Sequence, residues 1–396
     1  MKRIATILLS VFLTLGLAGC WSSTELTDMA IVTAFGIDKG DDGFRISVQV
    51  VNPGEIAAKN QSYGVPTTVY AANGKSMFEA IRRITTMTSR KLYFSHVRVV
   101  LFGEELAKDG IKKPLDFLSR DHEMRADFVM AIAKEMKAED AIKILTPMEK
   151  VAANKIYTSI ENSEKNWAPT KLVLLDDLVG ALVSQGKQPV ITGLEVLGDP
   201  NIGNKQENIQ QVKVPTTIKT NKIAVFDDDK LVGWLDEKES KGFNYITDNV
   251  TNTVGYVECE GGGTVTIELI RSKTKMKGKF ENGTPKINLT ITAEANVADV
   301  ECPIDLTNSK AIRDLEKQFN DKTKEIVLGS VEKAKTLEAD IFGFGEEIER
   351  VAPKKWEEIK NNWDEIFRTT EVVVKTDIKI RRLGTISDSF QEELEK

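Results

Sequence analysis

The chain has very few of the residues that build metal centres and disulfide frameworks. Its 396 residues include only two histidines and three cysteines. Two histidines exclude a histidine-rich metal site, and three cysteines are too few for a disulfide scaffold. Nucleic-acid binding needs a concentrated positive surface, whereas 54 basic residues stand here against 60 acidic ones, without an obvious basic cluster. We therefore expect no metal, no cofactor and no nucleic-acid partner.

Strong hydrophobicity is confined to the first twenty residues. Two basic residues precede an apolar run over 4–17, and two small residues then lead to Cys20. A basic start, an apolar stretch of about 14 residues and a small-residue exit are typical of a secretory signal peptide. A membrane-spanning helix needs roughly 20 apolar residues, so this run is short for one. We expect residues 1–19 to be a cleaved signal peptide.

The exit Leu17-Ala18-Gly19-Cys20 resembles a bacterial lipobox. In a lipobox the cysteine sulfur receives a diacylglycerol, and the cysteine becomes the mature N-terminus after cleavage. We therefore expect Cys20 to be an N-palmitoyl, S-diacylglycerol cysteine. The alternatives are an ordinary signal peptide with a chance cysteine, and an uncleaved anchor. Two acyl chains hold a protein stably at a bilayer, whereas one chain does so only marginally.

Cleavage also changes the charge of the protein. It removes two basic residues and leaves 52 basic against 60 acidic groups, a net charge of −8. Because anionic lipid repels an acidic body, we expect the diacylglycerol at Cys20 to make the membrane attachment, with the body in the extracytoplasmic space. That compartment permits a disulfide between Cys259 and Cys302. Two cysteines make no framework, however, and we favour buried thiols over a bridge.

In the first half of the chain, strands and helices are expected in short blocks. The capping box Ser76–Glu79 predicts a helix with Phe78, Ile81 and Ile84 on one face. His96 lies within a predicted strand and is expected to be packed in the core. We expect strands over 30–38, 44–52, 92–102, 126–134 and 188–197, and helices over 76–88, 114–120 and most of 138–185.

The second half has longer hairpins. Apolar residues alternate along 286–298, which indicates a half-buried antiparallel sheet. A long helix is expected to carry Ile312, Leu315, Phe319 and Ile326 on one stripe, and a shorter one to carry Trp356 and Trp363. The expected strands are 222–226, 231–235, 264–280, 286–298 and 371–383.

Blocks of strands and blocks of helices favour an α+β fold over a doubly wound α/β sheet. We expect three small α+β domains with mixed or antiparallel sheets and packed helices. The expected limits are 20–112 for the N-terminal domain, rejoined by 186–197, 113–185 for a mostly helical middle domain, 198–215 for a linker, 216–385 for the C-terminal domain and 386–396 for a tail.

The polar clusters in the sequence are weak candidates for a catalytic or metal-binding site. His122 lies in the charged run 120–125, where an ion-pair network is a better interpretation than an acid–base pair, because no nucleophile accompanies it. The run 227–229 lacks the spacing of a calcium loop and predicts a solvated turn. The glycines at 261–263 predict a flexible connection, and the two tryptophans favour core packing over a sugar platform. We expect no enzyme.

Short motifs along the whole chain follow the pattern of one known family. The expected mature start, Cys20 to Leu26, matches that pattern, although Ser22 stands where the family often has Asp. Further similarities are 30–32 and 35–38, 90–92 with His96, 103–107, 120–125, 224–226 with 231–235, 339–345, Trp356 and Trp363, and 381–384. In this order, over about 360 residues, they are specific, and the chain resembles the germinant receptor C subunits of spore-forming bacteria.

The resemblance implies three small α+β domains, no catalysis, and a lipoprotein on the outer face of the spore inner membrane. It further implies assembly with two integral-membrane subunits, A and B, in a receptor that senses nutrients and triggers germination. No motif defines a germinant pocket. The alternatives from other classes are a ligand-binding lipoprotein of a transporter, and a cell-wall hydrolase with paired carboxylates.

Overall fold

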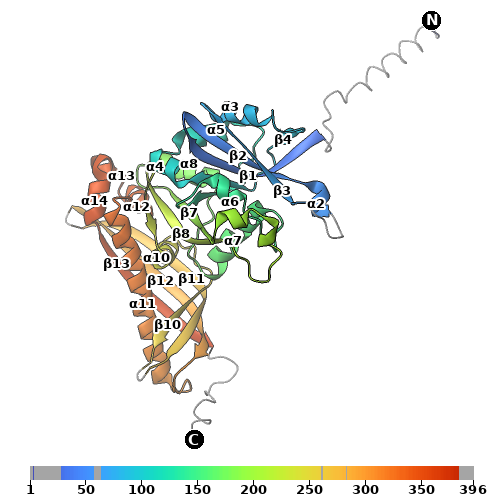
Figure 1. Cartoon of the computed structure of the whole chain (residues 1–396). Helices are drawn as coiled ribbons and strands as arrows, with labels where there is room; N and C mark the ends of the chain where they lie inside the picture. Colours follow the sequence, from blue (N-terminus) through green and yellow to red (C-terminus); the bar gives the residue numbers. More distant parts are fainter. Residues whose placement is uncertain (1–2, 4–27, 58–63, 260–261, 282, 383–396) are drawn as a thin grey trace.

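The computed structural model describes residues 3, 28–57, 64–259, 262–281 and 283–382. Within these residues the strands form two sheets, seen in Figure 1 as two layered bodies. The first sheet has nine described strands, in the order β3-β2-β1-β5-β6-β7-β8-β9, with β4 beside the start of β1. Its strands are β1 (Met29–Gly40), β2 (Gly43–Val51), β3 (Thr67–Gly74), β4 (Lys91–Tyr93), β5 (Val99–Gly103), β6 (Val129–Ala133), β7 (Val190–Leu197), β8 (Thr217–Asp227) and β9 (Lys230–Leu235).

Helices cover both faces of the first sheet. Every residue of the central strands β5 and β6 is buried, as expected for parallel strands with helices on both sides. One face packs against α3 (Met77–Ile84), α4 (Glu104–Asp109), α5 (Lys112–Arg120) and α8 (Leu175–Val183), and the other against α6 (Ala138–Ile142) and α7 (Ala152–Asn166). The short helix α2 (Pro53–Ala57) follows β2.

The second sheet has the order β10-β11-β12-β13. The long hairpin is antiparallel, and β13 runs parallel to β12. The predicted alternation over 286–298 is confirmed, since its apolar residues are buried and face α10–α14. The strands are β10 (Thr253–Glu258), β11 (Thr264–Glu281), β12 (Thr284–Val300) and β13 (Glu371–Arg382), and the helices are α10 (Glu237–Ile246), α11 (Ser309–Thr336), α12 (Phe344–Val351), α13 (Pro353–Ile359) and α14 (Trp363–Thr369). Figure 1 shows α11 lying along this sheet.

Some local predictions hold, and others need correction. The α+β class is confirmed, and Ser76 caps α3 by accepting a hydrogen bond from the Glu79 N–H. Phe78, predicted to face the core, is 52% exposed. The buried face of α3 is centred on Met77, Ala80, Ile81 and Ile84, which places Phe78 at its edge.

The predicted strand 92–102 is wrong, because it divides into β4 and β5. Both pair in parallel with β1: Met29 is opposite Lys91, and Ala34 is opposite Val99. Between these pairs β1 advances by five residues, whereas the segment from Lys91 to Val99 advances by eight. The extra residues of that segment form a turn. His96 lies in that turn and is exposed, contrary to the predicted core position.

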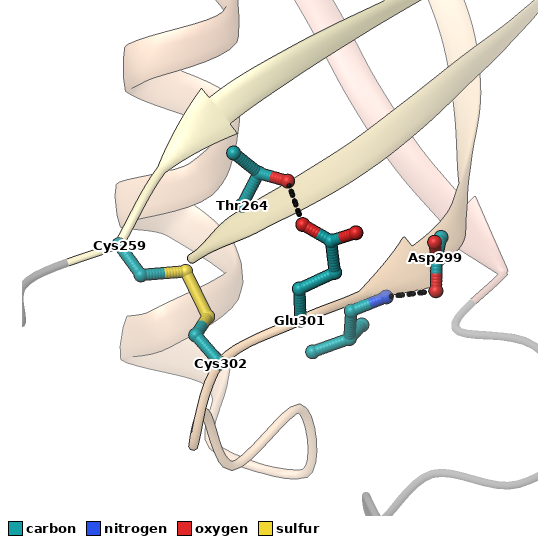
Figure 2. Close-up of a disulfide and its surroundings, with 6 residues drawn as sticks. Cys259, Thr264, Asp299, Glu301 and Cys302 are labelled. Carbon is teal, nitrogen blue, oxygen red and sulfur yellow. Dashed lines mark hydrogen bonds between the residues drawn. A yellow bond between two sulfur atoms is a disulfide. The ribbon is translucent and has the colours of Figure 1, made fainter. Parts of the chain in front are cut away.

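The predicted pair of buried thiols is also wrong. Cys259 and Cys302 form a disulfide with a Cα–Cα distance of 6.4 Å, drawn in Figure 2. The register explains it: Glu258 of β10 is opposite Thr264, and Val300 of β12 is opposite Val265. Because β10 and β12 flank the same end of β11, the cysteines that follow them meet there.

The expected linker 198–215 is partly structured. It contains the short helices α9 (Pro200–Gly203) and η2 (Gln206–Asn208), and the buried Asn208 amide donates to the Leu145 and Thr216 carbonyls. Strands β8 and β9 follow this segment and extend the first sheet. The first sheet therefore continues past residue 216, while the expected limits of the domains stay predictions.

Candidate functional site at the junction of the two sheets

The sequence-predicted site residues do not assemble into one centre. Cys20 lies outside the described residues. His122 is exposed, and its charged neighbours form separate ion pairs, such as Arg120 with Asp116 and Arg125 with Asp127. Among the described residues, no three His, Cys, Asp or Glu side chains are placed to hold a metal ion. No described helix has the length and apolarity needed to cross a membrane.

The acidic turn 227–229 has a structural role that the sequence did not reveal. Asp229 accepts a hydrogen bond from the Lys112 N–H at 2.9 Å, at the start of α5. The Asp228 N–H donates to the Gln188 side chain at 2.8 Å. The predicted solvated turn thus contacts two other segments of the protein through its backbone and carboxylates.

The β8–β9 hairpin belongs to two hydrophobic cores. Ala224, Phe226 and Leu231 pack in the core of the first sheet, whereas Ile223 and Val225 pack in the core of the second. Alternate residues of one strand point to opposite faces, so β8 inserts between the two bodies. The bodies therefore share buried apolar surface and do not sit at the ends of a free linker.

A first set of polar contacts lies between the end of α7 and α10. Asn244 on α10 is fully buried, and its amide donates to the Ala168 and Thr170 carbonyls at 2.8 and 2.9 Å. The Thr253 hydroxyl donates to the Trp167 carbonyl at 2.9 Å. Buried backbone carbonyls need such partners, and here the C-terminal half supplies them to the N-terminal half.

Trp167 strengthens this contact with its side chain. Its Nε1–H donates to Glu237 Oε1 at 2.9 Å, and the Lys241 Nζ lies 3.3 Å from the centroid of its ring. Burial lowers the pKa of Lys241 to about 8, and the Glu237 carboxylate opposes this shift. The ammonium is thus held over an aromatic face, an arrangement that is favourable when water is excluded.

A second set of contacts is organised by Asp340, whose side chain is fully buried in the turn before α12. Its Oδ1 accepts from the N–H groups of Phe342, Gly343 and Phe344 at 3.1–3.2 Å. Its Oδ2 accepts from the Gly345 N–H at 2.8 Å and from Trp363 Nε1 at 3.0 Å. Burial raises the pKa of Asp340 to about 6, and these donors act in the opposite direction.

The turn organised by Asp340 binds the loop between α8 and β7. The Gln188 N–H donates to the Asp340 carbonyl at 2.7 Å, and the Ser184 hydroxyl donates to Glu346 at 2.9 Å. A Cβ on Gly345 would lie 2.5 Å from the Gly186 Cα, so only glycine permits this approach. The glycines in 339–345 were a sequence signal for a tight turn at this position. The role of Asp340, whose carboxylate holds the turn together, was not predicted.

A cavity of about 230 Å³ lies at this junction, below the roughly 300 Å³ of small ligand pockets. Lys171 in its wall donates to Asn249 at 2.8 Å.

A larger, open polar depression of about 620 Å³ lies beside β1 and α6. In its wall, Glu139 pairs with Arg45 and Lys143; burial disfavours ionisation of Glu139, but hydrogen bonds from these two residues lower its pKa.

The arrangement of two linked bodies has known relatives. Residues 22–196 match the family model of the spore germination protein N-terminal domain, and residues 221–384 match the C-terminal model described as spore germination B3/GerAC like. The chain belongs to the spore germination B3/GerAC-like family. The junction described above thus connects the two halves that these models recognise.

Individual family members align along nearly the whole chain. Spore germination protein KC of Bacillus subtilis (strain 168) is 33% identical over 379 residues, covering 93% of each chain. Spore germination protein A3 of the same organism is 25% identical over 385 residues, covering 94% of this chain and 96% of that protein. The crystal structure of the GerBC protein has a TM-score of 0.54 at 18% identity, covering 87% of this chain and 96% of that one, which shows a shared fold.

These similarities confirm the predicted family, that of the germinant receptor C subunits. This family member therefore has a role in spore germination. In the motif 339–345, which supported the resemblance, Asp340 organises the turn and Gly345 permits its contact with the α8–β7 loop.

Proposed function

We propose that this protein is the lipid-anchored, non-enzymatic C subunit of a nutrient germinant receptor. The observation that carries the proposal is the match to both family models, covering residues 22–196 and 221–384, directly after a lipobox cysteine at position 20. A body anchored by two acyl chains stays at the membrane without a spanning helix. The proposed location is the extracytoplasmic face of the spore inner membrane.

The use of buried carboxylates supports a non-enzymatic role. Asp340 accepts hydrogen bonds from backbone N–H groups, as does Asp38, which accepts from Ala138 and Glu139 at 2.7 and 3.0 Å. Burial raises the pKa of Asp38, and these hydrogen bonds oppose the shift. Both carboxylates hold turns and helix starts in place, as N-capping side chains do.

The proposed partners are the A and B integral-membrane subunits of the receptor. The buried contacts between the two bodies support a role in which the C subunit couples its membrane partners and does not enclose a nutrient. The junction cavity is small, and in the wall of the larger depression Glu139 is already paired with Arg45. A transporter-type ligand-binding lipoprotein has no such supporting observation.

Deletion of the gene tests the proposal. Spores should form normally and lose germination with particular nutrients, and expression of the intact gene should restore the response. Tagged protein from spore membranes should co-purify with the A and B subunits. An unchanged response to every nutrient, in a strain without related receptors, would count against a receptor role. The purified protein should release no product from peptidoglycan; such release would favour the hydrolase alternative.

A further inference from the structure

The acidic chain has no obvious basic cluster in its overall composition, but the fold exposes basic residues at one end of the molecule. Residues 82–91 contain two adjacent arginines, then Arg90 and Lys91, and no acidic residue. All four basic side chains are exposed. Two large apolar residues, Met87 within this segment and Phe78 just before it, are 48% and 52% exposed. We call Phe78, Arg82, Arg83, Met87, Arg90 and Lys91 the basic patch.

The helix α3, which carries part of the basic patch, is packed against the first sheet. The opposite face of α3 is buried in the core of the first sheet, so the outward side chains of this helix are held on the surface. The Arg82 guanidinium lies 4.7 Å from the centroid of the Phe78 ring. Arg83 and Lys91 each pair with one carboxylate, Glu79 and Glu123. Two carboxylates against four cations leave the patch positive on a protein whose net charge is negative.

The position of the patch relative to Cys20 is set by strand pairing. Lys91 is paired with Met29, the first residue of β1. Cys20 precedes Met29 by nine residues, which span at most about 30 Å when fully extended. Figure 1 shows α3 and β4 at the end of the molecule where β1 begins, with the second sheet extending away from it. A lipid on Cys20 therefore keeps this end of the body close to the bilayer.

We propose that the basic patch binds the headgroups of anionic phospholipids and so orients the body on the membrane. This inference rests on the proposed lipidation of Cys20 and specifies which face meets the bilayer. Basic residues near an anionic leaflet are attracted to it, and exposed aromatic and thioether side chains beside them suit the headgroup boundary. The acidic remainder of the body is repelled and points away.

The test uses the full lipidated protein reconstituted in phosphatidylcholine vesicles with or without phosphatidylglycerol. With Cys20 acylated and the other two cysteines bonded, Met87→Cys provides one reactive thiol for a fluorophore. Val351→Cys is a matched reference, since Val351 on α12 is also 48% exposed. Headgroup nitroxide lipids should quench the label at position 87 and leave the label at 351 bright.

A charge variant and its control complete the experiment. Arg82→Gln, Arg83→Gln, Arg90→Gln and Lys91→Gln together should remove most quenching at position 87, as should high salt, because exposed charges are screened. The same charge change on α11, with Gln at Lys310, Arg313, Lys317 and Lys324, all exposed, should leave quenching unchanged. Phosphatidylcholine alone should give several-fold weaker quenching than the anionic vesicles.

The outcomes separate this inference from the proposed function. If the protein floats with vesicles and its Cys20 peptide carries acyl chains, but position 87 is not quenched more than position 351, the patch does not face the bilayer. If position 87 becomes shielded only when the A and B subunits are present, the patch binds a protein partner and the inference is wrong. If the protein neither floats nor carries acyl chains, the anchor itself is refuted, and with it the premise of the inference.

Discussion

Trp363 donates its indole N–H to Asp340 Oδ2 at 3.0 Å, and both side chains are buried at the junction of the two bodies. The bond links α14 to the turn that precedes α12. The ring of Trp363 also meets Trp356 in an edge-to-face contact, with 5.3 Å between ring centroids. The two tryptophans are therefore core residues, as predicted, and one of them also serves as a hydrogen-bond donor.

We predict that Asp340 makes stability fall as pH rises from about 4 to about 6. The folded state holds its pKa at about 6, whereas an unfolded aspartate titrates near 4. The folded protein therefore binds this proton more tightly than the unfolded chain does. The resulting contribution to the free energy of unfolding is complete below pH about 4 and is lost as the pH rises past about 6. The loss is at most roughly 3 kcal/mol. Urea midpoints measured over this range for the full protein and for Asp340→Asn should differ in slope.

Trp363→Phe should raise the pKa of Asp340 further, because it removes a donor that favours the carboxylate. Leaving a buried acceptor short of a partner should also lower the free energy of unfolding at neutral pH by about 1–3 kcal/mol. Carboxyl NMR titration and urea unfolding measure the two effects. Trp356→Phe is the matched control, since Trp356 makes no hydrogen bond to Asp340; an equal pKa change in both variants would contradict the assignment.

Gly345→Ala should destabilise the junction. The added Cβ would meet the Gly186 Cα at 2.5 Å and Trp363 Nε1 at 2.8 Å, and such overpacking typically costs about 1–3 kcal/mol. Gly329→Ala provides the comparison, because an alanine Cβ at this exposed position of α11 meets nothing within 4 Å and should stabilise the helix by about 0.5–1 kcal/mol. Thermal unfolding of both variants tests the prediction, which fails if Gly345→Ala is neutral.

The Cys259–Cys302 disulfide should stabilise the second sheet. It closes a loop of 43 residues in sequence, for which chain entropy predicts about 4 kcal/mol. Replacing both cysteines with serine should lower the unfolding midpoint, and reductant should lower it equally in the unmodified protein but not in the variant. Thiol titration of the denatured protein should find two thiols only after reduction. Two thiols before reduction would show that the bridge is absent.

Cys20→Ala should prevent acylation and leave the unprocessed precursor. Labelling with a radioactive fatty acid, together with membrane fractionation, measures this, and assembly with the A and B subunits should weaken. Double replacement of Cys259 and Cys302 should leave lipid labelling intact. Normal labelling of Cys20→Ala would refute the assignment of the lipid site.

Local patterns allowed much of the secondary structure to be predicted. The Ser76 N-cap of α3, the hairpin at 227–230 and the alternation on β12 depend on residues close together in sequence, and all three form. The strand 92–102 was mispredicted because its break depends on pairing with β1. The role of Asp340 was missed because its partner Trp363 lies 23 residues away and is brought to it only by packing.

The sequence by itself predicted a lipobox and determined the family motifs and the α+β character, because each depends on residue types at short spacing. Only the tertiary structure decided that Cys259 meets Cys302, that the two bodies interlock through Asp340 and Asn244, and that the basic patch lies beside Met29. These relationships follow from strand register and helix packing, which bring together residues far apart in sequence. The charge of the whole chain is acidic, but the fold determines where its positive charge gathers.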